Sequence, residues 1–355
     1  MEGSGLLKAA VYYGPRDIRI EDVPEPSPGP GELLIEVSRN GICGSDLHTY
    51  VGGERGGATL HLPGVVLGHE FAGVVREVGE GVDDITVGTA VAIAPIEYCG
   101  SCWSCAHSWP QMCRQLGLYG GYRRPLHGGL APLVAVSRRS AFVVPEGLGV
   151  VEAALAEPMA VATHAVRRAP TILGSTVLIL GAGPIGLGVL QAARASGATT
   201  TIVSEVSAAR QDAARGLGAT VVVDPTSGDL RSAVGDITRQ GVDIVFDTTA
   251  VHAAFNEGVR SLRPRGTMVS VAGWSQLAQV DMGVAMAKEI DIRFSMTYEP
   301  EIDFPATLAM LASGAFNADV MISDQIPLER LIEDGLEELL HNADSHLKIL
   351  VDPSI

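Results

Sequence analysis

Four of the five cysteines in the chain lie within one short stretch. They occur in YCGSCWSCAHSWPQMC with the spacing C-x2-C-x2-C-x7-C, and they are Cys99, Cys102, Cys105 and Cys113. Turns between such closely spaced thiolates can hold four sulfur atoms at tetrahedral positions about 2.3 Å from a zinc ion. Two disulfides in the same stretch would be geometrically crowded. The spacing therefore predicts a structural zinc site, whose four sulfur ligands leave no open position for chemistry.

Two other interpretations of this stretch stay open. Four reduced thiols could lie in a loop without metal, although neighbouring exposed thiols are prone to oxidation. His107 could also replace one of the sulfur ligands, although four cysteines already complete the set.

A glycine-rich turn is the second group of residues with a chemical pattern. Gly181, Gly183 and Gly186 form G-x-G-x-x-G, with Pro184 and Ile185 before the last glycine. The pattern follows a β-branched run and begins a helical one, which is the context of a dinucleotide-binding turn. There the glycines permit a tight turn, close approach of a pyrophosphate and close contact between helix and strand. The amino terminus of the helix then faces the negative charge.

Two charged residues after this turn bear on the choice of dinucleotide. Glu205 ends the next apolar run, where a carboxylate can accept hydrogen bonds from both hydroxyls of the adenosine ribose and would repel a 2′-phosphate. This position predicts NAD rather than NADP. Arg210, one helical turn further, leaves NADP open, because an arginine near this position can accommodate the phosphate. Glu205 could also be a solvated acid at the end of a strand.

The elements that must position these residues show two patterns in a chain of 355 residues, which is longer than the roughly 250–300 residues of a single core. Residues 8–150 contain short apolar runs separated by glycine and proline, which indicates a β-rich domain. From about residue 158, strand-like and helical runs alternate, which indicates a doubly wound parallel sheet. The last apolar run, LKILVD, is expected to return to the first domain. We therefore predict an α/β protein with a first domain formed by residues 1–157 and 297–355, and an inserted nucleotide-binding domain formed by residues 158–296.

The composition limits the expected partners. Forty-one acidic and 25 basic residues give a net charge of −16, which repels nucleic acid and anionic membranes. The most apolar stretch, TVLILGAGPIGLGVL, is interrupted by glycine and proline and is too short to cross a bilayer core of about 30 Å. The first residues, MEGSGLLKAA, lack the pattern of a secretory signal. We expect a cytoplasmic protein without nucleic acid or membrane partners.

Three further motifs carry a resemblance to a known family. They are CGSDLH, LGHEFAGVVREVG, which fits G-H-E-x2-G-x5-G-x2-V, and AEPMAVATHAV. With the cysteine stretch and the glycine turn, they make the chain resemble the zinc-dependent medium-chain alcohol dehydrogenases over nearly its full length. The E-P pair and the segment DFPATLAMLASG resemble the polyol branch of that family, and most of all the (R,R)-butanediol dehydrogenases. Sorbitol and threonine dehydrogenases are nearby relatives.

The resemblance implies a fold and a reaction. The fold is a β-rich GroES-like catalytic domain with an inserted doubly wound, parallel-sheet Rossmann domain. The reaction transfers a hydride between NAD and a small secondary alcohol or vicinal diol, such as 2,3-butanediol, and the corresponding ketone. Two zinc ions per chain and a homodimer or homotetramer are also implied.

The resemblance further implies the ligands of the catalytic zinc. Cys43 and His69 match the firm ligands, while Glu70 and Glu157 share the remaining positions with a water or the substrate oxygen; which glutamate binds directly stays open. Two of these residues also have simpler interpretations. Glu157 precedes Pro158 and could cap a helix. Cys43 lies in an apolar stretch and could be a small core residue.

Roles for three neighbours of Cys43 follow from the same resemblance. Asp46 is expected to accept a hydrogen bond from His69 and so fix its tautomer. Ser45 and His48 match a hydroxyl and imidazole relay that passes a proton to solvent, a role that suits an imidazole with an unperturbed pKa of about 6.5.

Two alternatives to the butanediol assignment remain. A sorbitol-like polyol dehydrogenase or a threonine dehydrogenase is one alternative, because the segments expected to shape the pocket, residues 50–64 and 118–130, differ freely within such families. The first of these contains Tyr50 and apolar residues, which suits a short carbon chain. A non-enzymatic nucleotide-binding protein is the other alternative, but such a chain would be expected to lose Cys43, His69 or Glu70 first.

Overall fold

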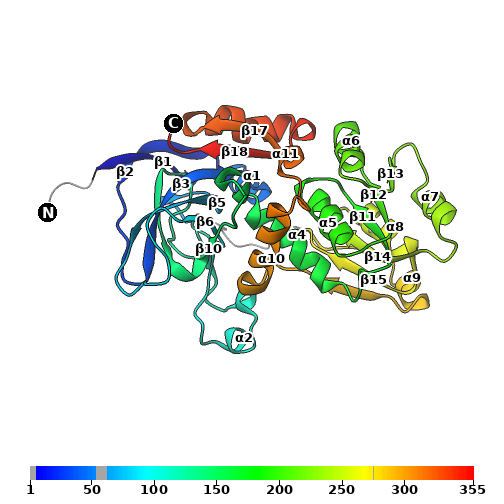
Figure 1. Cartoon of the computed structure of the whole chain (residues 1–355). Coiled ribbons are helices and arrows are strands. Elements are labelled where there is room, and N and C mark those ends of the chain that lie inside the picture. The colour runs from blue at the N-terminus through cyan, green and yellow to red at the C-terminus, as the bar shows by residue number, and fades with distance from the viewer. Residues whose placement is uncertain (1–4, 53–61, 275) are drawn as a thin grey trace. The chain divides into compact units, whose positions relative to one another are not determined.

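The computed structural model describes residues 5–52, 62–274 and 276–355, and the chain divides into two compact units (Figure 1). The first unit contains residues Met1–Glu157, Glu299–Gly314 and Met321–Ile355, and the second contains Pro158–Tyr298 and Ala315–Val320. No helix in the described part of the chain is long and apolar enough to cross a membrane.

The first unit is built on antiparallel β-structure. One sheet has the order β2-β1-β4, and a seven-stranded sheet has the order β10-β6-β5-β3-β18-β17, with β9 also paired to β3. The bounds are β1 (Leu6–Gly14), β2 (Asp17–Pro24), β3 (Glu32–Gly41), β4 (Val65–Val66), β5 (Glu70–Val78), β6 (Ala90–Ile93), β9 (Leu133–Ser137), β10 (Ala141–Val143), β17 (Ile322–Pro327) and β18 (Lys348–Asp352). Leu33, Ile35 and Val75 of β3 and β5 are fully buried in one hydrophobic cluster, which explains why these short apolar runs pair in the core.

Short helices and one small sheet complete the first unit. The small sheet pairs β7 (Ile96–Glu97) with β8 (Gly117–Leu118) at the base of the cysteine stretch. The helices are α1 (Gly44–Tyr50), α2 (Trp103–Ala106), α3 (Val150–Ala153), α10 (Pro300–Ala312) and α12 (Glu338–His341).

The second unit has the doubly wound architecture that the sequence predicts. Its six-stranded parallel sheet has the order β13-β12-β11-β14-β15-β16. The strands are β11 (Thr176–Leu180), β12 (Thr200–Ser204), β13 (Val221–Val223), β14 (Val242–Asp247), β15 (Leu262–Ser270) and β16 (Asp291–Phe294). The helices are α5 (Pro184–Ala195), α6 (Ala208–Gly216), α7 (Leu230–Ile237), α8 (His252–Ser261) and α9 (Met282–Ala287). The central strands are buried along their length, as expected when helices cover both faces of a parallel sheet.

The boundary between the units differs from the expected one at residues 297–298 and at residues 315–320, all of which belong to the second unit. The segment Ala315–Val320 belongs to the second unit, whereas the sequence analysis assigns all of residues 297–355 to the first. The reason is local: Phe316 is buried, and the main-chain N–H of Asn317 donates to Gln191 Oε1 on α5 at 2.7 Å. Two helices include a point where the chain passes from one unit to the other, α4 (Ala156–Arg168) and the four-residue α11 (Ala318–Met321).

Candidate metal centres and nucleotide site

The clustered cysteines bring their sulfur atoms into one compact group. Cys102 Sγ lies 3.5 Å from Cys105 Sγ and 3.9 Å from Cys113 Sγ. Cys99 Sγ lies 4.0 Å from Cys105 Sγ and 3.6 Å from Cys113 Sγ. Two sulfur ligands of a tetrahedral zinc ion are about 3.8 Å apart when each bond is about 2.3 Å long. The four cysteines therefore fit zinc without rearrangement.

Main-chain N–H groups point at these sulfur atoms. Cys99 N donates to Cys113 Sγ and Cys102 N donates to Cys99 Sγ, both at 3.3 Å. The amides of Ser101 and Cys102 lower the pKa of the Cys99 thiol to about 6. This favours the thiolate, which is the form that binds a metal.

His107 lies apart from the sulfur group. Its Nδ1 is 2.7 Å from the carbonyl oxygen of Trp103, and its ring packs against Trp103 and Trp109, with centroids 4.2 and 5.7 Å away. The ring is thus held by the main chain and by two indoles, whereas all four sulfur atoms group together.

A second group of potential ligands forms around the lone cysteine. One ligand atom each from Cys43, His69 and Glu70 lies within 4.8 Å of the others. Cys43 precedes α1, while His69 and Glu70 stand at the start of β5. A sulfur, a nitrogen and an oxygen donor suit zinc, and three protein ligands leave a position open, as a catalytic zinc requires.

The start of α1 fixes the position of Cys43. Cys43 is the N-cap residue: its Sγ accepts from Ser45 N at 3.5 Å, and its own N–H donates to Asp46 Oδ2 at 2.9 Å. This reciprocal arrangement is a capping box with a thiol in place of the usual hydroxyl. The sequence CGSD therefore holds the sulfur at the amino terminus of α1, in contact with the main-chain N–H of Ser45.

Asp46 and Ser45 both lie beside His69. Asp46 Oδ1 is 3.7 Å from His69 Nδ1, an ion-pair distance rather than a hydrogen bond, and Ser45 Oγ is 3.4 Å from His69 Nε2. Burial by itself lowers the pKa of His69, but the charges of Asp46, Cys43 and Glu157 outweigh it and raise that pKa well above its ordinary value. The site therefore attracts positive charge, which also favours a metal cation.

One residue of this site, Lys348, is missed by sequence reasoning. Its Nζ donates to both carboxylate oxygens of Glu70, at 2.8 and 2.6 Å, and to the carbonyl oxygen of Ile42 at 2.9 Å. The two side chains are only 4% and 2% exposed. Gly41 makes room for the pair, because a Cβ there would lie 2.3 Å from Glu70 Oε2. The signal in the sequence is a single lysine in the otherwise apolar start of LKILVD, since a charge in a buried strand needs a partner.

Glu157 and His48 are the remaining residues expected at this site. Glu157 is buried in the first turn of α4, and its charge acts on both His69 and Lys348. His48 is exposed on α1, one turn after Ser45.

Only parts of the two segments expected to shape a substrate pocket, residues 50–52, 62–64 and 118–130, are described by the structure. Residues 53–61 lie outside the described residues. Tyr50 is buried, and its hydroxyl donates to Glu337 Oε1 at 2.6 Å. Residues 119 and 125–128 line a cavity of about 640 Å³ together with residues 23–27, and none of the metal-ligand candidates contributes to its wall.

The three glycines of the nucleotide turn have distinct environments. Gly181 has a φ of +89°, which a side chain would strain. A Cβ on Gly186 would lie 2.0 Å from the carbonyl oxygen of Gly181, so only glycine lets helix and strand approach. A Cβ on Gly183 would meet no atom within 4 Å, which leaves open space in front of α5 for a pyrophosphate. Pro184 begins α5 as its first residue, with Ile185 next.

Glu205 is held rigidly after β12. Its Oε2 accepts from Ala182 N at 2.6 Å, and its Oε1 accepts from Val206 N and Ser207 N at 2.8 and 2.9 Å. The carboxylate thus links the end of β12 to the glycine turn. Arg210 follows in the first turn of α6, with its N–H at 3.5 Å from the capping Ser207 Oγ.

Comparisons with known proteins agree with this architecture. Residues 29–146 match the alcohol dehydrogenase GroES-like domain, and residues 184–313 match the zinc-binding dehydrogenase family. An (R,R)-butanediol dehydrogenase of Bacillus subtilis is 36% identical, over 98% of this chain and 100% of that protein. A sorbitol dehydrogenase of Bacillus subtilis is 35% identical, over 98% of each chain.

Solved structures show the same fold over the whole length. The crystal structure of 2R,3R-butanediol dehydrogenase from Bacillus subtilis superposes with a TM-score of 0.89 at 35% identity, covering 98% of this chain and 99% of that one. A zinc-binding dehydrogenase from Sinorhizobium meliloti, bound to NADP, superposes with a TM-score of 0.90 at 32% identity, covering 98% and 100%. The GroES-like and Rossmann architecture expected from the sequence is thereby confirmed.

Proposed function

The chain belongs to the zinc-binding alcohol dehydrogenases, and we propose that within this family it transfers a hydride between NAD and a small vicinal diol of the 2,3-butanediol type. The observation that carries the proposal is the contrast between the two groups of ligands. Four sulfur atoms form a closed set in the lobe, whereas Cys43, His69 and Glu70 form a mixed set with a position left for a substrate oxygen.

The zinc ion would be held by Cys43 and His69, with Glu70 and Glu157 beside it. When bound, it supplies Lewis-acid polarisation of an alcohol oxygen, and NAD supplies the hydride acceptor. The protein itself then has to hold its ligands in place and carry away one proton per turnover. The capping box of α1 does the first of these tasks for Cys43.

A proton path begins at Ser45. Its hydroxyl lies 3.4 Å from His69 Nε2, at the centre of the ligand group. His48 stands one turn later on the same helix and is exposed, so an imidazole there can exchange protons with solvent near neutral pH. We assign the relay to these two residues, and His48→Gln should lower kcat at neutral pH while leaving the zinc content unchanged.

Glu205 supports NAD as the cofactor. Three main-chain N–H groups hold its carboxylate in place after β12, where it would meet the ribose hydroxyls of the adenosine half. A 2′-phosphate would meet the same fixed negative charge. The NADP-bound relative makes the ratio of kcat/KM for NAD to that for NADP the deciding measurement.

The substrate class follows from the polar groups at the site and from the relatives. Glu70 and Glu157 can offer acceptors to a second hydroxyl, and an alcohol lacking that hydroxyl leaves a polar contact unmade, at a cost of about 1–3 kcal/mol. Relatives named for butanediol and for sorbitol match this chain about equally, at 36% and 35% identity. The test is kcat/KM for 2,3-butanediol against 2-butanol, sorbitol and threonine. A preference for sorbitol or threonine rejects the diol, and equal activity on 2-butanol shows that the second hydroxyl is not recognised.

We also propose that the enzyme is a homodimer or homotetramer. Strand β16 ends the parallel sheet, and large apolar side chains next to this edge are exposed: Met282 by 65%, Met286 by 77% and Phe294 by 67%. Such an edge invites pairing with a second copy. Light scattering with size-exclusion chromatography tests this, and a monomer at micromolar concentration contradicts it.

A cytoplasmic location is the last part of the proposal. All five cysteines are free thiols, and both ligand groups need reduced sulfur. A reducing compartment keeps thiols in that form. Fractionation of the producing cell checks the location.

A further inference from the structure

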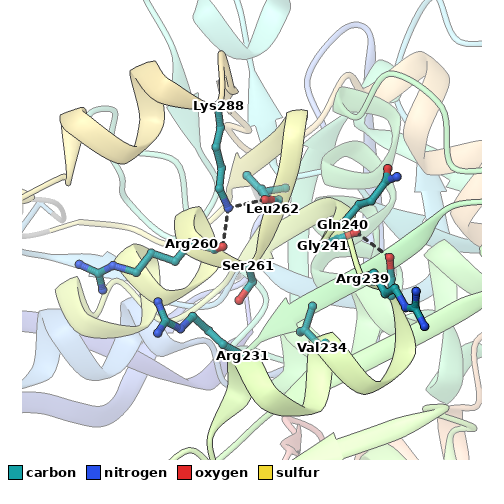
Figure 2. A pocket seen from close by; sticks show the side chains of 11 residues that line it. Arg231, Val234, Arg239, Gln240, Gly241, Arg260, Ser261, Leu262 and Lys288 are labelled. Carbon is teal, nitrogen blue, oxygen red and sulfur yellow. Dashed lines mark hydrogen bonds between the residues drawn. The ribbon is translucent and has the colours of Figure 1, made fainter.

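A small pocket in the second unit is not part of the nucleotide site. Its volume is about 220 Å³, and it lies between α7, the end of α8 and the turn before β14 (Figure 2). Gly241 and Ser261, which line it, directly precede β14 and β15. The pocket is therefore at the amino ends of these parallel strands, whereas the glycine turn follows the carboxyl end of β11. The pocket and the glycine turn therefore lie at opposite ends of the strands of this parallel sheet.

The pocket is basic although the chain is acidic. Its wall contains Arg231, Arg239, Arg260 and Lys288, in a chain with a net charge of −16. Arg260 is neutralised, because it pairs with Glu257 at 2.8 Å and with Asp281 at 3.1 Å.

Two of the arginines have no acidic partner. Across residues 5–52, 62–274 and 276–355, the guanidinium groups of Arg231 and Arg239 make no ion pair or hydrogen bond. Arg231 also stands in the first turn of α7, where the helix dipole opposes a positive charge. Both side chains are exposed at the rim of the pocket, where their guanidinium groups can contact an anion.

Lys288 brings a further positive charge into the pocket. Its Nζ donates to the carbonyl oxygens of Arg260 and Leu262, at 2.5 and 2.6 Å, and these bonds close the end of α8 (Figure 2). An ammonium group has three N–H donors, so one remains. Burial and the nearby charge of Arg231 lower the pKa of Lys288. The two cations repel one another, and an anion between them would relieve that repulsion.

The pocket also contains an unsatisfied hydroxyl. Ser261 is 3% exposed, and its Oγ has no hydrogen-bond partner among the described residues. In Figure 2 this oxygen points toward the side of the pocket formed by Arg231 and Val234. A buried hydroxyl without a partner costs about 1–3 kcal/mol, which a ligand acceptor would recover. Gly235 keeps the α7 side open, since a Cβ there would meet no atom within 4 Å.

We propose that this pocket binds a phosphate group, as the free anion or as a small phosphate ester. Phosphate oxygens match the donors present: the guanidinium fork of Arg231, the free N–H of Lys288 and the hydroxyl of Ser261. Arg239 lies on the opposite rim in Figure 2 and adds charge there. At about 220 Å³, the pocket is smaller than the roughly 300–1,000 Å³ of a site for a drug-sized ligand, so a whole nucleotide is not the expected occupant.

The experiment titrates the full-length enzyme, saturated with NAD, with three probes at constant ionic strength. Bound NAD occupies the pyrophosphate position at the carboxyl end of β11, so the phosphate probes cannot bind there. The probes are inorganic phosphate, glycerol 3-phosphate and AMP, followed by calorimetry and by the rise in melting temperature that ligand binding produces. Arg231→Gln and Ser261→Ala test the pocket. Arg265→Gln is the matched control: this arginine is 81% exposed and lies outside the pocket, 3.9 Å from Glu289.

The expected result is saturable binding of one phosphate probe per chain. Arg231→Gln should weaken it at least tenfold, Ser261→Ala several-fold, and Arg265→Gln less than twofold. Tighter binding of glycerol 3-phosphate than of inorganic phosphate identifies an ester as the ligand, and the reverse identifies the free anion. The proposal is overturned if none of the probes saturates below 10 mM, if AMP alone binds, or if Arg265→Gln weakens binding as much as Arg231→Gln does.

Discussion

Replacing Lys348 by methionine should destabilise the first unit strongly. The substitution keeps an unbranched side chain that is one atom shorter and removes the ammonium group, which donates to Glu70 Oε1, Glu70 Oε2 and the carbonyl of Ile42. Because Lys348 and Glu70 are 4% and 2% exposed, water cannot replace the lost partner. Removing one member of a buried ion pair costs about 3–5 kcal/mol. For a unit of roughly 200 residues, this corresponds to a fall in melting temperature of about 6–20 °C.

The assay is thermal and urea unfolding followed by circular dichroism, in a buffer with a chelator so that metal does not compensate the free carboxylate. Lys8→Met is the matched control. Lys8 also pairs with an acid, Asp22 at 2.9 Å, but the two side chains are 52% and 53% exposed. Loss of such a surface pair costs about 0–1 kcal/mol.

A double-mutant cycle separates the ion pair from the packing of Lys348. Glu70→Gln, Lys348→Met and the double variant should show a coupling free energy of about 2 kcal/mol or more, since the groups are in direct contact. The reasoning is refuted if Lys348→Met costs no more than Lys8→Met, or if the two single effects add within about 0.5 kcal/mol.

Three further outcomes are expected. Cys43→Ser should abolish turnover and leave one zinc per chain, whereas Cys102→Ser should destabilise the four-cysteine lobe, because a structural zinc contributes folding free energy. Metal analysis that finds one zinc or none in active, metal-replete enzyme contradicts both expectations. Glu205→Ser should weaken NAD binding and narrow the kcat/KM ratio of NAD to NADP, and a wild-type enzyme that prefers NADP refutes the assignment. Gly183→Ala should fold normally and bind NAD more weakly, whereas Gly186→Ala should lower the melting temperature, because its Cβ would lie 2.0 Å from a main-chain oxygen. Equal melting temperatures of the two variants would be inconsistent with this geometry.

The features that sequence could predict are those encoded by neighbouring residues. The glycine turn needs only the strand before it and the helix after it, and the cysteine stretch needs only its own turns. In both cases the structure brings together residues that are close in the chain. The parallel sheet was predictable for the same reason, because each strand and helix shows its own periodicity.

The features that sequence could not predict depend on distant residues. Lys348 meets Glu70 across 278 positions of the chain, through the pairing of β18 with β3. The basic pocket gathers α7, the end of α8 and Lys288, none of which carries a recognisable motif. Asp46 shows a third case: the resemblance implies a partner of His69, and in the structure Oδ1 lies 3.7 Å from His69 Nδ1 while Oδ2 accepts from Cys43 N at the start of α1, a second role that the sequence does not indicate. A residue pattern identifies which chemical groups are present, whereas the fold determines which contacts each group makes.

The buried lysine also explains how one site can contain so many acids. Cys43, Glu70 and Glu157 all lie in or beside the ligand group, and as thiolate and carboxylates they carry three negative charges. A divalent zinc alone would leave one of these charges unbalanced in a poorly solvated interior, which is costly. The ammonium of Lys348 supplies one positive charge against Glu70, while the buried carboxylate of Asp46, 3.7 Å from His69, adds one more negative charge. The same lysine holds both oxygens of Glu70, so a movement of Glu70 toward a metal would lengthen or weaken these bonds. An exchange between Glu70 and Glu157 at a metal would therefore have to overcome the Lys348–Glu70 pair, and the double-mutant cycle measures the strength of that pair in the metal-free protein.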